Sequence, residues 1–215
     1  MEPYRRTRQK IRRFLFRSNL SNTKIMKQTI KLFSLVIIFL TLLNTGDTQA
    51  QNRIETLKGY SPQIGTTLSM MDDLKRRVTS SVIGLNQEET DFLLDNNANR
   101  IGAMIMHLAA TEKYYQLYTF ENRGFNKEEK KKWDTALSLG QAGRDALKDK
   151  PIDYYLDIWN EVREETKRLL KTKDDEWFAS KVKKSSMNNH WAWYHVMEHQ
   201  ANHMGQIRLI TKRIK

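Results

Sequence analysis

Four of the chain's five histidines lie within fourteen residues near its C-terminal end. The last three, His195, His199 and His203, are spaced four residues apart, so they share one face of any helix that contains them. His190 lies five residues before this stripe. Neutral imidazole is the commonest metal ligand among side chains. The stripe therefore predicts a metal site rather than a set of scattered surface histidines.

The geometry of a helix limits how many of these histidines can bind one ion. Neighbours in the stripe are about 6 Å apart along the axis, and His195 and His203 are about 12 Å apart. Zinc–nitrogen bonds are only about 2.0–2.1 Å long. One helix can thus supply two ligands, and His107 is the only histidine elsewhere in the chain. Spacing alone leaves both pairs open, 195 with 199 and 199 with 203.

The elements that must position these histidines are predicted to be helices. The chain contains only three prolines and nine glycines, and apolar residues recur at spacings of three and four rather than two. This pattern predicts helices over residues 62–79, 87–94, 98–120, 127–148, 151–172 and 188–213. Helices of about twenty residues with one apolar face pack together as a bundle. We therefore predict a single all-α domain over residues 51–215, an up-and-down or crossover four-helix bundle.

The first 50 residues differ from the rest in charge and hydropathy. They carry ten basic and two acidic side chains, so they account for +8 of the net charge of +12. Residues 32–43 form an apolar run of the length of a signal-peptide core, and Thr48-Gln49-Ala50 resembles a cleavage site. We predict a basic extension and signal peptide over 1–50, with translation starting at Met26 and cleavage after Ala50. We expect the protein then to be exported to the periplasm; the alternative is a membrane anchor at residues 32–43.

Composition also restricts the ligands and partners. The chain has no cysteine, which excludes disulfides and a thiolate metal site, so any metal is held by nitrogen and oxygen. Zinc is the ion we expect, with nickel, manganese and iron as alternatives. Residues 51–215 carry a net charge of only +4, and nothing in this balance predicts a nucleic-acid partner. We expect contact with a membrane only through the signal segment.

Two segments resemble the DinB-like superfamily of metal-binding four-helix bundles. They are His107-Leu108-Ala109-Ala110-Thr111-Glu112 and Glu198-His199-Gln200-Ala201-Asn202-His203-Met204-Gly205-Gln206-Ile207. The resemblance covers roughly residues 60–213. It implies that His107, His199 and His203 are the metal ligands and that His195 lies beside the site, one turn before the pair. Known branches of the superfamily include thiol-dependent transferases and isomerases, and proposed hydrolases.

Three further side chains are weaker candidates for a role beside the metal. His195 is one, and Gln206 could orient a ligand through a hydrogen bond, as metal sites usually require. Glu112 could act as a base, but we favour its interpretation as a solvated helix residue. The catalytic residues themselves are not identified by the sequence.

The expected function is that of a metal-dependent hydrolase or transferase acting on a small molecule. Export would separate the domain from the cytoplasmic thiol pool, which disfavours a thiol transferase. The alternative is a non-catalytic metal-binding or interaction bundle in which the ion only joins two helices. Bundles of this kind often pair through helix faces, so we expect a homodimer.

Overall fold

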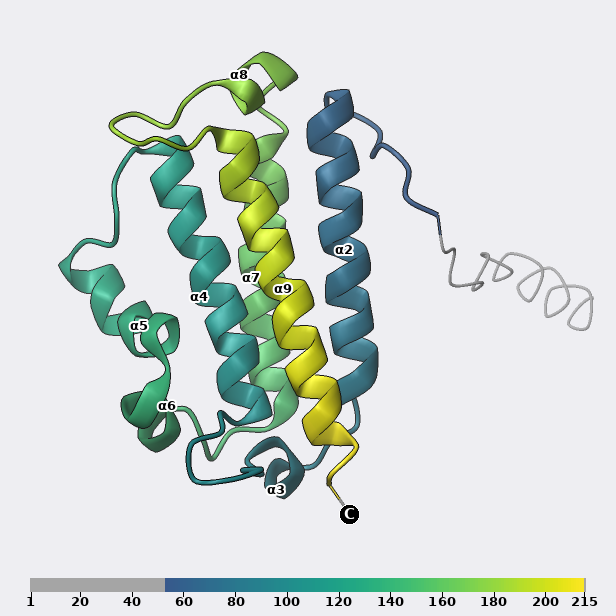
Figure 1. Ribbon diagram of the computed structural model, residues 1–215, viewed down its shortest axis with the longest axis vertical. Coiled ribbons are helices and arrows are strands. Elements are labelled where there is room, and N and C mark those ends of the chain that lie inside the picture. The colour runs from purple at the N-terminus through teal and green to yellow at the C-terminus, as the bar shows by residue number, and fades with distance from the viewer. Residues whose placement is uncertain (1–52, 215) are drawn as a thin grey trace, which may run out of the picture. The chain divides into compact units, whose positions relative to one another are not determined.

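Four long helices dominate residues 53–214, the part of the chain that the computed structural model describes (Figure 1). They are α2 (Pro62–Val82), α4 (Ile101–Phe120), α7 (Ile152–Leu170) and α9 (Asn189–Thr211). The connections between them contain the shorter helices α3 (Gln87–Thr90), α5 (Lys127–Ser138), α6 (Gly140–Ala146) and α8 (Asp175–Ala179). Within the described residues no β-strand forms, and Lys181 and Asn188 make one isolated bridge. The predicted all-α bundle is confirmed.

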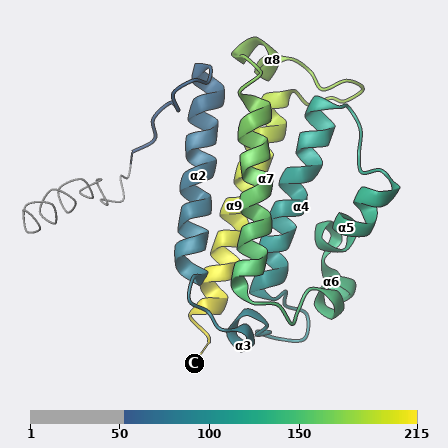
Figure 2. The same ribbon diagram turned by 180° about the vertical axis from the view of Figure 1, so that it is seen from behind.

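The central helix of the bundle is α4, which packs against α7, α9 and α5 (Figures 1 and 2). Gly102 near the start of α4 meets Tyr155 near the start of α7, and Gln116 near its end bonds to Thr166 near the end of α7. The two helices are therefore parallel, and α5 and α6 lie in the crossover that joins them. α9 runs in the opposite direction to both. Of the two predicted topologies, the crossover bundle is the one observed.

Burial in the bundle follows the apolar spacing of the sequence. On α2, Ile64, Leu68 and Met71 follow one another at spacings of four and three, and they are fully buried in a cluster with Phe178 of α8 and with Trp193 and Val196 of α9. Between α4 and α7 the buried ring of Tyr155 packs directly on Gly102, where an added Cβ would lie 2.4 Å from Cε2 of that ring. This contact needs glycine because any larger residue would force the buried ring of Tyr155 out of its position.

The predicted helix boundaries hold for the four long helices to within a few residues. The predicted segment 127–148 instead forms two helices, α5 and α6, which are separated at Leu139. The backbone of Leu139 has φ = 52°, a conformation that interrupts the helix although the side chain is largely buried. The short helix α8 was not predicted, because it has only five residues and no apolar period of its own.

The predicted extension and signal peptide of residues 1–50, with Met26 and Ala50, lie outside the described residues. Among residues 53–214, no helix combines the length and apolarity needed to span a membrane.

Candidate metal centre

Three imidazole rings meet between α4 and α9. His107 comes from α4, and His199 and His203 come from successive turns of α9. Each residue offers a ligand atom, and these atoms all lie within 4.8 Å of one another. The Nε2 atoms of His107 and His199 are 2.6 Å apart, and the ring of His203 lies 4.9 Å from that of His107. The structure thus brings together one pair from the stripe and the single distant histidine.

Hydrogen bonds orient two of the three rings. Nδ1 of His107 donates to the carbonyl oxygen of Ala136 on α5 at 2.9 Å, and Nδ1 of His203 donates to Oε1 of Gln206 at 2.9 Å. With the proton on Nδ1, each ring turns the lone pair of Nε2 toward the other histidines. Such outer contacts fix the tautomer and orientation of metal-binding imidazoles. Within residues 53–214, Nδ1 of His199 has no comparable partner.

The environment keeps the three imidazoles uncharged at neutral pH. Burial lowers the pKa of His107 below its ordinary value. Burial, together with the neighbouring imidazoles, lowers the pKa of His199 to about 4. Burial and the proximity of His107 likewise lower the pKa of His203 to about 4. The neutral ring is the form that binds a metal, so the cluster is ready to act as a ligand set without first losing protons.

The arrangement fits a divalent transition-metal ion. Imidazole nitrogen suits zinc, nickel, copper and iron, and no other His, Asp or Glu within residues 53–214 joins the cluster. Nitrogens bound tetrahedrally at about 2.0–2.1 Å lie about 3.4 Å from one another. His107 and His199 must therefore move apart by about 0.8 Å to share an ion, which a rotation of the half-buried ring of His199 can provide.

The remaining histidines lie outside this cluster. His195 is one turn before His199, its ring stacks on Trp191 at 5.2 Å, and its Nδ1 donates to Glu198 at 3.1 Å. His190 stacks on Phe178 instead. The structure therefore places His195 beside the three-histidine cluster, 5.7 Å from the ring of His199.

The interpretation of Glu112 as a solvated residue is wrong. Its side chain is fully buried, and its carboxylate faces α7, where it accepts hydrogen bonds from Arg163 at 2.8 and 3.0 Å. Thr166, Trp159 and Gln200 also donate to it. None of these bonds reaches a histidine. The carboxylate serves instead as the anion that compensates a buried guanidinium.

Arg163 is the buried partner that the sequence did not reveal. Its side chain is 2% exposed, and besides Glu112 it contacts Asp72 of α2 through Nη1 at 2.9 Å. The available signal was its position one turn after Trp159, on the face of α7 that also contains Thr166 and Leu170. An arginine on an apolar face calls for a buried acid, and Glu112 is that acid.

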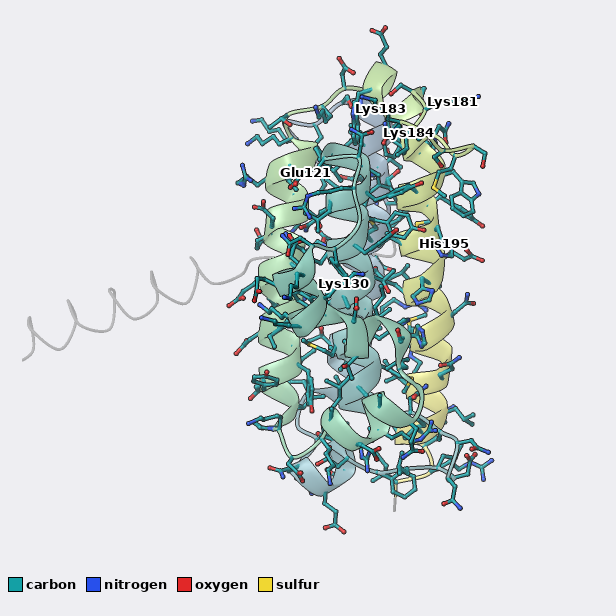
Figure 3. All side chains as sticks on the ribbon, turned by 90° about the vertical axis from the view of Figure 1, so that its left-hand side faces the viewer. Glu121, Lys130, Lys181, Lys183, Lys184 and His195 are labelled. Atoms are coloured by element: carbon teal, nitrogen blue, oxygen red, sulfur yellow. The ribbon has the colours of Figure 1, made fainter. Side chains whose placement is uncertain are left out.

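Aromatic side chains lie beside the cluster toward the N-terminal end of α9. The ring of Tyr115 lies 5.8 Å from that of His195, on the side of α4. Trp191 and Tyr194 are each 46% exposed. Figure 3 shows His195 on α9 below a loop that carries the labelled lysines of residues 181–184. A surface cavity of about 450 Å³ in this region is lined by Ala179, Lys181, Ser186, Met187, Asn188 and Trp191.

Fold and site together define a DinB-like four-helix bundle with a three-histidine cluster capable of binding a metal. A family model described as mycothiol-S-transferase matches residues 66–215, which includes all three histidines. The chain belongs to this family, which is part of the DinB-like superfamily. A comparison with curated proteins gives no match.

Proposed function

We propose that the protein is a metal-dependent transferase that binds the sulfur of a thiol at the centre formed by His107, His199 and His203. The observation that carries this proposal is the ligand set itself. Three neutral nitrogens converge, and within the described residues no further His, Asp or Glu joins them. A site with three protein ligands and an open position is typical of catalytic rather than structural zinc. The family description supplies the reaction class.

The roles of the chain's own residues follow from their contacts. The three histidines would hold the ion, which we propose to be zinc, with nickel, manganese and iron as the alternatives. When bound, such an ion lowers the pKa of a coordinated thiol or water and so supplies a nucleophile at neutral pH. The carbonyl of Ala136 and the amide of Gln206 accept hydrogen bonds from Nδ1 of His107 and His203, and so would leave their Nε2 lone pairs free to hold the ion.

Metal analysis combined with a thiol-transfer assay tests this function. We expect about one divalent ion per chain, and its loss when His107, His199 or His203 is replaced by Ala. His190→Ala is the matched control, since its ring lies on Phe178 and outside the cluster. The purified protein should consume a thiol, with mycothiol and simple thiols as probes, in the presence of an electrophile such as a chlorinated aromatic.

The outcomes separate the competing functions. If the protein binds metal and hydrolyses an ester or amide but does not consume a thiol, it is a hydrolase that uses the same centre. Metal that raises thermal stability, with no exogenous ligand binding to it, would identify a non-catalytic site that joins α4 to α9. Full metal occupancy in His107→Ala would refute the two-helix centre itself.

We also propose that the domain acts outside the cytoplasm, on the basis of the apolar run at 32–43 and the small residues that end at Ala50. The thiol would then have to be present in the cell envelope. Mass spectrometry of the envelope fraction should find a mature chain beginning at or near Gln51. Protein found only in the cytoplasm, with residues 26–50 attached, would contradict export.

A further inference from the structure

One hydroxyl beside the three-histidine cluster has no assigned role. Thr111 lies on α4 one turn after His107, and one turn before Tyr115. His107 meets His199 on α9, and Tyr115 meets His195, one turn nearer the start of α9. Positions i, i+4 and i+8 of a helix share a face. Thr111 therefore faces α9 between these two contacts, beside the turn that carries His199.

The hydroxyl of Thr111 is buried and lacks a partner. The residue is 6% exposed, and Oγ1 makes no hydrogen bond within the described residues. Two other buried threonines in helices donate to the carbonyl four residues earlier: Thr119 donates to Tyr115 at 2.6 Å, and Thr90 to Asn86 at 2.8 Å. This local bond is the usual solution for threonine in a helix. A buried hydroxyl without it calls for an explanation.

The charges around Thr111 determine what it can bind. The three histidines are neutral, so a centre that holds a divalent ion would carry a positive charge and attract an anionic ligand atom. Within residues 53–214 no carboxylate joins the three histidines. Glu112 faces away toward Arg163 on α7, and Glu198 pairs with His195 at the half-exposed side of α9. A threonine hydroxyl can donate one hydrogen bond to such an anion.

We propose that Thr111 is a ligand-binding residue whose Oγ1–H donates a hydrogen bond to the anionic atom, a thiolate sulfur or an oxyanion, that occupies the open position of the three-histidine centre. The proposal rests on the metal-dependent function given above. It assigns the buried hydroxyl to the substrate rather than to the fold, and it explains why the hydroxyl is not used by the backbone of α4.

The test uses the full chain loaded with Co²⁺, whose visible absorption reports exogenous ligands. Azide and the thiolate of 2-mercaptoethanol are the anionic probes. Imidazole is a neutral probe that coordinates through nitrogen and leaves no acceptor for Thr111. Thr111→Val removes the hydroxyl at nearly constant volume, and Thr111→Ser restores it. Thr119→Val is the control on the same helix, because that hydroxyl already bonds to the backbone.

We expect Thr111→Val to bind Co²⁺ at wild-type stoichiometry but azide and thiolate about 10- to 100-fold more weakly, the loss expected for a hydrogen bond to a charged group. Imidazole binding should change less than threefold, and Thr111→Ser should bind azide within about threefold of wild type. A threefold change in affinity is clearly smaller than the tenfold loss that corresponds to one hydrogen bond to a charged group.

Three results would overturn the inference. Equal azide affinity in wild type and Thr111→Val would show that the hydroxyl does not contact the ligand. Loss of Co²⁺ from Thr111→Val would assign the hydroxyl to the ligand set instead. An equal loss of azide affinity in Thr111→Ser would point to packing. Failure of the wild-type protein to bind Co²⁺ or any exogenous ligand would instead refute the proposed function on which this inference rests.

Discussion

Replacing Glu112 tests whether the buried carboxylate supports the fold or acts at the metal centre. Its side chain is fully buried and accepts bonds from Arg163 at 2.8 and 3.0 Å and from Thr166 at 2.6 Å. The indole of Trp159 donates at 3.2 Å, and the amide of Gln200 at 3.3 Å. Glu112→Ala removes all of these acceptors at once, while it leaves the three histidines in place.

The expected loss is large because the guanidinium of Arg163 stays buried. It keeps only Asp72, at 2.9 Å, whose side chain is one-third exposed and therefore a weaker, partly solvated partner. Removing one member of a buried ion pair costs about 3–5 kcal/mol. A change of 1 kcal/mol shifts the melting temperature of a domain of this size by about 2–4 °C. Glu112→Ala should therefore lower the melting temperature by about 6–20 °C.

Far-UV circular dichroism during heating measures this shift, and metal analysis at low temperature measures the centre separately. The control is Glu198→Gln, because that carboxylate lies at the surface and its replacement should change stability by less than about 0.5 kcal/mol. Removing both charges as Glu112→Met with Arg163→Met should cost less than Glu112→Ala alone. An unchanged melting temperature with lost metal or activity would refute the scaffold role of Glu112.

Three further predictions follow from individual contacts. Gln206→Leu removes the acceptor for Nδ1 of His203 and should weaken metal binding about 10- to 100-fold, measured by competition with a chelator. Gly102→Ala should cost about 1–3 kcal/mol in denaturant unfolding, because the added Cβ would meet the ring of Tyr155. The pKa of His199 and His203 is about 4 in the fold, against about 6.5 when unfolded, so the unfolded chain binds more protons between these values. The metal-free protein should thus keep its stability above about pH 6.5 and lose it as pH falls toward 4. If denaturant unfolding gives the same free energy of unfolding at every pH in that range, the burial of these rings is contradicted.

The long helices could be predicted because their apolar residues follow the helical period. Ile64 and Leu68 on α2 illustrate this, since the same spacing that predicts the helix also identifies its buried face. The break at Leu139 could not be predicted in the same way. A leucine with positive φ has no local signature, and the conformation is imposed by the packing of α5 and α6.

The site was predictable only in part. Spacing shows that one helix can supply two ligands and that His107 must supply another, but it does not choose between His195 and His203. That choice depends on the register of α4 against α9, which is set by contacts between residues about ninety positions apart. Local sequence contains no information on such a register. The choice of His203 over His195 therefore came from the resemblance to a family. The sequence also failed to predict that Glu112 points toward α7 rather than toward solvent, because that orientation too depends on how the helices pack.

The Glu112–Arg163 pair also bears on how that register is held. Glu112 is bonded to Arg163 on α7 and to Gln200 on α9, and Gln200 is the residue next to His199. This one carboxylate, five residues after His107, thus links α4 to both α7 and α9. Apolar packing tolerates small shifts between helices, whereas directed hydrogen bonds do not, and a slip of one turn would displace His107 by about 5.4 Å. We therefore expect the double replacement by Met to retain most of the stability but to bind metal at least tenfold more weakly than wild type. Wild-type metal affinity in that variant, measured by chelator competition, would show that apolar packing alone aligns the three histidines.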